Sequence, residues 1–140
     1  MHMRVDALPE NLSRALLVLR IGLGVFLLQW GIEKFVVPQN TPGIWGHFYR
    51  LNVPQALAYL FGVVEVALAV CLFLGRFKTI TYGTAMSLHA VSVIVSWRQL
   101  LDPWGDPSNH LFIAGVPVLA AFVALFLLRD LDHGIVTTRS

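Results

Sequence analysis

The chain has 140 residues and a net charge of +2; 56% of its residues are hydrophobic, 13% are charged, and its mean hydropathy is +0.70. Because a soluble globular domain has roughly a quarter of its residues charged, this composition excludes a water-soluble fold and indicates an integral membrane protein. The few basic residues form no patch with interleaved aromatic residues, so binding to nucleic acid is not expected.

Four continuously apolar blocks, at about 15–37, 53–74, 79–97 and 110–128, are separated by short polar segments. Each block is close to the roughly 20 residues that a membrane-spanning helix needs, and none shows the alternation of a spanning β-strand. The sequence therefore predicts one all-α transmembrane domain over 1–140, a four-helix bundle with up-down-up-down topology. Such a protein has the lipid bilayer as its first partner.

The first block ends in Glu33 and Lys34 and not in a small-residue cleavage site, which indicates a retained span and not a signal peptide. Arg20, Gly24, Gly31 and Lys34 fall on one side of this helix, within a sector of roughly 80°. Two interpretations of Arg20 stand: its side chain reaches the headgroups, or it pairs with an acid inside the bundle. Glu33 and Lys34 either mark the outer membrane boundary or serve a site that opens outward.

The second block follows Pro54, ends at Gly75 and holds Glu65 near its centre. A carboxyl group at that depth is expensive unless it is paired, so it predicts either a functional site or a contact inside the bundle. Cys71 is the chain's single cysteine. Thiol redox chemistry needs a second cysteine, and Cys71 is therefore expected to be a packing residue.

In the third block, Tyr82 and His89 share one helical face. If the second and third spans are antiparallel neighbours, Glu65 and His89 both lie about eleven residues or more from the connecting turn, hence at similar depth. The predicted contact between them has two interpretations. It is a proton-handling pair beside a buried site such as a quinone pocket, or Glu65 is neutral, bonds to His89, Tyr82 or a serine, and only holds the helices together.

Metal and haem sites are not predicted. His89 is the only histidine deep in a span, and a bis-histidine haem needs two such residues. His47 and His110 fall on the outer side with Glu33, but without the spacing of metal ligands. No intrinsic cofactor is therefore expected.

The distribution of Lys and Arg predicts the orientation of the chain. These residues are more frequent near both termini and the 75–78 turn than in the other two loops. The positive-inside rule then places the N and C termini in the cytoplasm.

Five short motifs occur in an order that resembles the DoxX family of small bacterial four-helix membrane proteins. They are Leu19-Arg20-Ile21-Gly22-Leu23-Gly24, Gly31-Ile32-Glu33-Lys34-Phe35, Val53-Pro54, Gly62-Val63-Val64-Glu65 and Leu74-Gly75-Arg76. The resemblance covers about the first eighty residues. It implies a multi-pass protein of the bacterial inner membrane that is linked to redox metabolism, since similar members include a subunit of a thiosulfate:quinone oxidoreductase. Arg20, Lys34, Glu65 and Arg76 occupy positions of the family pattern.

Three functions follow as hypotheses. The first is a membrane subunit of a respiratory or redox complex that is not itself an enzyme; it anchors a partner protein and contributes Glu65, His89, Tyr82 and Arg20 to a quinone or proton-handling site. The second is a structural or assembly subunit without chemistry. The third is a small transporter or proton conductor, against which the absence of an inverted repeat counts.

Overall fold

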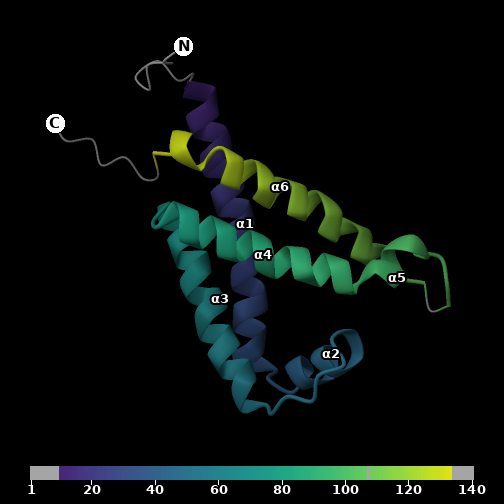
Figure 1. Ribbon diagram of the computed structural model, residues 1–140. Coiled ribbons are helices and arrows are strands. Elements are labelled where there is room, and N and C mark those ends of the chain that lie inside the picture. Colours follow the sequence, from purple (N-terminus) through teal and green to yellow (C-terminus); the bar gives the residue numbers. More distant parts are fainter. Residues whose placement is uncertain (1–9, 107, 134–140) are drawn as a thin grey trace.

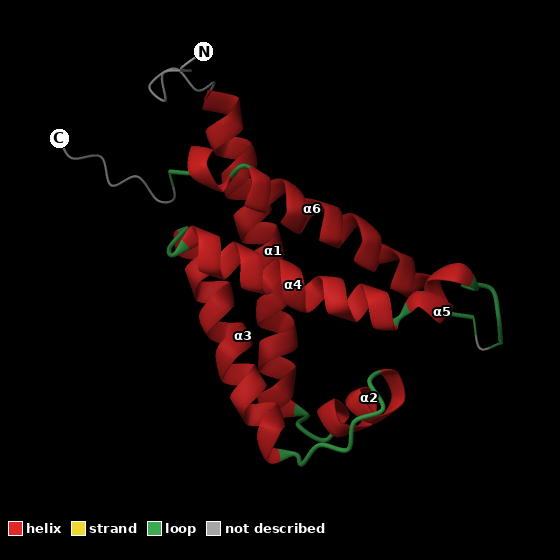
Figure 2. Ribbon diagram, viewed as in Figure 1, coloured by secondary structure: helices red, strands yellow, loops and turns green. Residues whose placement is uncertain are grey.

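The computed structural model describes residues 10–106 and 108–133, and in these ranges helices joined by loops make up the fold, without a strand (Figure 2). The all-α prediction is confirmed, and four long helical segments follow the four apolar blocks. The elements in chain order are α1 (Glu10–Val36), α2 (Asn40–Phe48), α3 (Ala56–Leu74), α4 (Lys78–Val95), α5 (Trp97–Leu101), the 3-10 helix η2 (His110–Ala114), α6 (Gly115–Leu127) and the 3-10 helix η3 (Arg129–Leu131).

The long helices associate as two pairs. α1 packs along α3, and α4 packs along α6, with the α4–α6 hairpin lying across the α1–α3 pair (Figure 1). The beginning of α1 and the segment after α6 lie at the same end of the molecule, here called the terminal end, and α2 lies at the other, the α2 end. The hydrophobic core joins the two pairs and consists of Leu16, Leu23, Leu27, Ala69, Leu72, Tyr82, Ala85, Phe122 and Leu125.

Two glycines bring α1 and α3 into close contact. A Cβ atom on Gly31 of α1 would lie 2.9 Å from Val66 Cγ2 and 3.1 Å from the Val66 backbone nitrogen. A Cβ atom on Gly62 of α3 would lie 2.8 Å from the Phe35 ring. Small residues at such positions let helix backbones approach closely, which is the usual means of helix association in membranes.

A tight turn connects α3 to α4. Gly75 has φ 63° and ends α3, with its N–H donating to Leu72 O and the Arg76 N–H donating to Cys71 O. This is the Schellman arrangement, which a glycine adopts without steric strain. Phe77 follows with φ 49°, a conformation that non-glycine residues rarely adopt.

The short helices α2 and α5 were not predicted. α2 begins shortly before Pro42, which the first turn of a helix tolerates because its N–H would have no partner there. Aromatic contacts hold α2 on the rest of the fold: the ring centroids of Trp45 and Phe61 are 4.6 Å apart, and those of Phe48 and Phe112 are 5.8 Å apart. Tertiary contacts of this kind stabilise a helix that is too short to form alone.

Three helical segments are long and apolar enough to cross a membrane: Glu10–Val36, Ala56–Leu74 and His110–Leu127. Many large apolar side chains on their surfaces face outward, for example Val18 at 69% exposure and Leu111 at 81%. The chain is therefore a membrane protein, since lipid is the environment in which such a surface is stable. The block predicted at 79–97 forms α4, which is not among the three; Lys78 and several Thr, Ser and His residues make this helix less apolar.

Candidate functional site

The first candidate site is a buried ion pair between α1 and α3. Lys34 Nζ donates to Glu65 Oε2 at 2.8 Å, and the two side chains are only 10% and 14% exposed. The close approach at Gly31 and Gly62 produces this contact, because those glycines lie one turn or less from the paired residues. Glu65 thus faces the bundle, and its partner is a cation on the neighbouring helix.

The lysine side chain points toward the interior of the helix pair. Lys34 Nζ also donates to Trp30 O at 3.3 Å, one turn back along α1 and away from the nearer end of that helix. A lysine that marks a membrane boundary extends the opposite way, toward the headgroups. Lys34 therefore faces the bundle, whereas its neighbour Glu33 is partly exposed and accepts a bond of 3.0 Å from Asn40 Nδ2.

Aromatic residues lie close in sequence to the pair on both helices, with Phe35 next to Lys34 and Phe61 one turn before Glu65. Phe61 meets the Trp45 ring edge-on, and Phe35 stacks near Tyr59 with centroids 6.1 Å apart. A charged donor, a carboxyl group and flat apolar rings together make the type of surface that holds a small planar polar headgroup. The ammonium group can donate to a carbonyl oxygen, and the carboxyl group can give or take a proton.

The second cluster lies at the terminal end and is centred on Asp132. Tyr82 donates to Asp132 Oδ2 at 2.5 Å, and Arg20 Nε lies 3.2 Å from the same oxygen, in an ion pair without the alignment of a hydrogen bond. Arg20 and Asp132 are 2% and 3% exposed. Lys78 Nζ donates to the backbone oxygen of Asp132. Of the two interpretations of Arg20, the structure supports pairing with an acid.

Arg20 also closes the end of α3. Its Nη1 donates to Phe73 O at 3.2 Å, a carbonyl in the last turn of α3. Carbonyls in that turn lack an intrahelical donor, and the guanidinium group supplies one. The predicted stripe of Arg20, Gly24, Gly31 and Lys34 is buried along its whole length. At one end Arg20 pairs with Asp132, and at the other end Lys34 pairs with Glu65.

His89 does not contact Glu65, so the predicted hydrogen bond between them is wrong. His89 Nε2 lies 2.8 Å from Gly115 O, and since a carbonyl only accepts, this ring nitrogen carries a proton. The imidazole meets Phe26 at 5.2 Å and Phe122 at 5.7 Å between centroids. The physical reason for the error is helix pairing: α3 packs along α1 and presents Glu65 to Lys34, whereas α4 packs along α6, where His89 bonds to Gly115 O.

The outer-side residues do not form a cluster. His47 packs against Phe48, His110 packs against Trp104, and Glu33 bonds to Asn40. Among residues 10–106 and 108–133, no group of three or more His, Cys, Asp or Glu lies close enough together to hold a metal ion.

A family model described as DoxX matches residues 15–97, more than half of the chain. The protein belongs to the DoxX family. No curated protein and no solved structure matches it. Arg20, Lys34, Glu65, Tyr82 and His89 all fall within the part of the chain that matches DoxX.

Asp132 lies beyond the DoxX match, and the sequence analysis missed it. It stands just after Arg129 and Asp130, beyond the fourth apolar block at about 110–128. The available indication was Arg20: a buried guanidinium requires an acid, and the predicted up-down-up-down topology places the acids after the last apolar block at the same end as the first half of α1.

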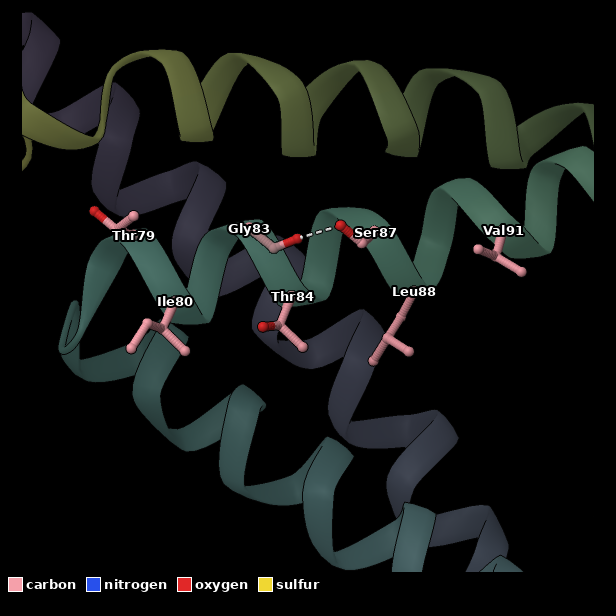
Figure 3. A pocket seen from close by; sticks show the side chains of 7 residues that line it. All are labelled: Thr79, Ile80, Gly83, Thr84, Ser87, Leu88 and Val91. Carbon is pink, nitrogen blue, oxygen red and sulfur yellow. Dashed lines mark hydrogen bonds between the residues drawn. The ribbon is translucent and has the colours of Figure 1, made fainter.

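α4 carries a shallow groove of about 430 Å³ along its exposed face (Figure 3). Ile80, Thr84 and Leu88 point away from α6 in this view, and Ser87 Oγ donates to Gly83 O at 2.8 Å. All the residues that line the groove belong to α4: Thr79, Ile80, Gly83, Thr84, Ser87, Leu88 and Val91.

Proposed function

We propose that this DoxX protein is a membrane subunit of a bacterial redox complex, in which it anchors a partner protein and supplies the Lys34–Glu65 pair to a quinone-binding, proton-handling site. The observation that carries the proposal is the burial of this ion pair between α1 and α3, one turn from Phe61. Ionisable groups at membrane depth are expensive and commonly mark functional sites.

The chemistry suits a quinone headgroup. Reduction of a quinone consumes protons at its two carbonyl oxygens, and a site needs a donor to orient one oxygen and an acid to deliver a proton. Lys34 is the donor and Glu65 the acid in this proposal, and the electrons come from a partner, because the chain carries one cysteine and no recognised redox group.

The topology belongs to the same proposal. We place the protein in the bacterial inner membrane with four spans, α4 included, and with both termini in the cytoplasm. Two facts support α4 as a span: Tyr82 and His89 bond to Asp132 and Gly115 within the protein, so its interior polar groups are satisfied. The positive-inside distribution of Lys and Arg supports the orientation.

Copurification tests the partner. Extraction of the protein from its native membrane in mild detergent, followed by mass spectrometry, is expected to recover an oxidoreductase in constant stoichiometry. Recovery of the protein alone from membranes in which it functions would contradict the proposal.

Substitution tests the site. Glu65→Gln in the intact complex is expected to lower quinone turnover by about 10²-fold or more, the usual contribution of a positioned acid. Glu33→Gln is the matched control, because this neighbouring carboxyl group is partly exposed and accepts from Asn40 instead of Lys34. Unchanged turnover in Glu65→Gln, with the complex still assembled, would show that the pair only joins helices.

The α4 groove favours a second candidate, a structural subunit without chemistry. Its lining includes one glycine, one serine and two threonines, small residues that membrane helices use to pack against one another. For this function, Thr84→Leu is expected to reduce recovery of the partner while Glu65→Gln leaves turnover unchanged.

A further inference from the structure

The chain after α6 turns back toward the helices and forms a short strap, residues 129–133. Arg129 fixes its direction: Nη1 donates to Phe126 O at 2.8 Å, and the guanidinium carbon lies 4.2 Å from the centre of the Phe126 ring. Leu131 N donates to Leu128 O at 2.9 Å. The strap therefore presents Asp132 inward while Asp130 stays exposed.

Asp132 joins the strap to both helix pairs. Its carboxyl group accepts from Tyr82 of α4 and pairs with Arg20 of α1, and its backbone oxygen accepts from Lys78 at the start of α4. Through Arg20 the same cluster reaches Phe73 O at the end of α3. These residues, Arg20, Lys78, Tyr82 and Asp132, are the Asp132 junction.

The junction lies beside the turn on which the hairpin would rotate. Gly75 and Phe77, both with positive φ, separate α3 from α4, and Lys78 and Tyr82 follow within the first turns of α4. A small rotation at this turn moves the far end of α4 by much more, because the helix is 18 residues long.

A buried ion pair adds little net stability, because the loss of hydration offsets the attraction, and its better-attested contribution is to select one arrangement over others. We propose that the Asp132 junction is a latch that holds the α4–α6 hairpin in one orientation on the α1–α3 pair, and that opening it lets the hairpin rotate about the Gly75–Phe77 turn. This latch is independent of the function proposed for Lys34 and Glu65.

The orientation of the hairpin can be measured with two spin labels. In a Cys71→Ser background, Val63→Cys on α3 and Ile94→Cys on α4 provide exposed sites far from the turn. Double electron–electron resonance on the labelled protein in lipid nanodiscs gives the distribution of distances between them. The latch variant is Asp132→Asn, and the matched control is Asp130→Asn in the same strap.

A narrow distribution is expected for the parent protein and for Asp130→Asn, and a shifted or broadened one for Asp132→Asn with unchanged helix content by circular dichroism. A distribution in Asp132→Asn that superimposes on that of the parent would overturn the proposal. If Asp132→Asn does not fold, the Tyr82→Phe variant tests the proposal instead. It removes the hydrogen bond from the Tyr82 hydroxyl group to Asp132 and leaves the ion pair between Arg20 and Asp132. A distribution in Tyr82→Phe identical to that of the parent would then overturn it.

Discussion

The two buried ionic clusters of this molecule differ in what they connect. Lys34 and Glu65 join two helices that already touch through Gly31 and Gly62. The two side chains are 10% and 14% exposed. The Asp132 junction joins α1, the end of α3, the start of α4 and the strap, and its ion pair is only 2% and 3% exposed.

This difference separates two roles for charge inside a membrane protein. A carboxyl group held from several sides in a dry interior fixes the relative positions of the elements that surround it. A pair between two helices that are already in contact is less necessary to the fold, and its residual exposure leaves access for a proton or a ligand. This difference is the reason that we propose an architectural role for Asp132 and a chemical role for Glu65.

The largest effect is expected for Asp132→Ala. Removal of one partner of a buried ion pair leaves Arg20 uncompensated and lowers the free energy of unfolding by about 3–5 kcal/mol. Unfolding by SDS titration from mild detergent micelles, followed by circular dichroism, measures it. The exposed neighbour provides the control, Asp130→Ala, for which little change is expected. Equal changes in the free energy of unfolding for Asp132→Ala and Asp130→Ala would contradict the architectural role proposed for Asp132.

A smaller effect is expected for Lys34→Met. Loss of a hydrogen bond to a charged group lowers the free energy of unfolding by about 1.5–3 kcal/mol, and Glu65 can take up a proton instead of remaining charged. The same SDS titration measures the change. In the double variant Lys34→Met/Glu65→Leu most of the stability should return, since no buried charge is left. A double variant less stable than Lys34→Met would assign the pair an architectural role as well.

Gly31→Ala tests whether the Lys34–Glu65 ion pair depends on close packing of α1 against α3. The added methyl group would meet Val66 and force the helices apart, which lowers the free energy of unfolding by about 1–3 kcal/mol. Gly22→Ala is the matched control on the same helix, because nothing lies within 4 Å of its added Cβ. Equal stability of the two variants in the titration would show that the close approach at Gly31 does not limit packing.

The smallest effect is expected for His89→Phe, which belongs to neither cluster. It keeps the aromatic packing against Phe26 and Phe122 and removes one hydrogen bond to Gly115 O, a loss of about 0.5–1.5 kcal/mol in the free energy of unfolding. Quinone turnover of the complex is expected to stay unchanged. A fall in turnover comparable to that of Glu65→Gln would return His89 to the proton-handling site.

The sequence predicted some of the residues in the two ionic clusters and missed others. The inward stripe of α1 was predicted correctly, because a helical repeat fixes which residues share a face once a helix forms. The partner of Glu65 was predicted wrongly, because similar depth on sequential helices does not determine which helix a face meets. Asp132 was missed since it lies outside the apolar blocks, where no periodicity applies.

The sequence by itself determined the helical membrane class, the four apolar segments and the DoxX family. These follow from local rules: in lipid, each backbone polar group must be satisfied within its own segment, so composition and length define the helices. Only the tertiary structure decided that Glu65 pairs with Lys34 and that Asp132 closes the terminal end. Both contacts depend on how closely α1 approaches its neighbours at Gly31 and Gly62 and on how the chain turns after α6, and these are properties of packing between distant segments.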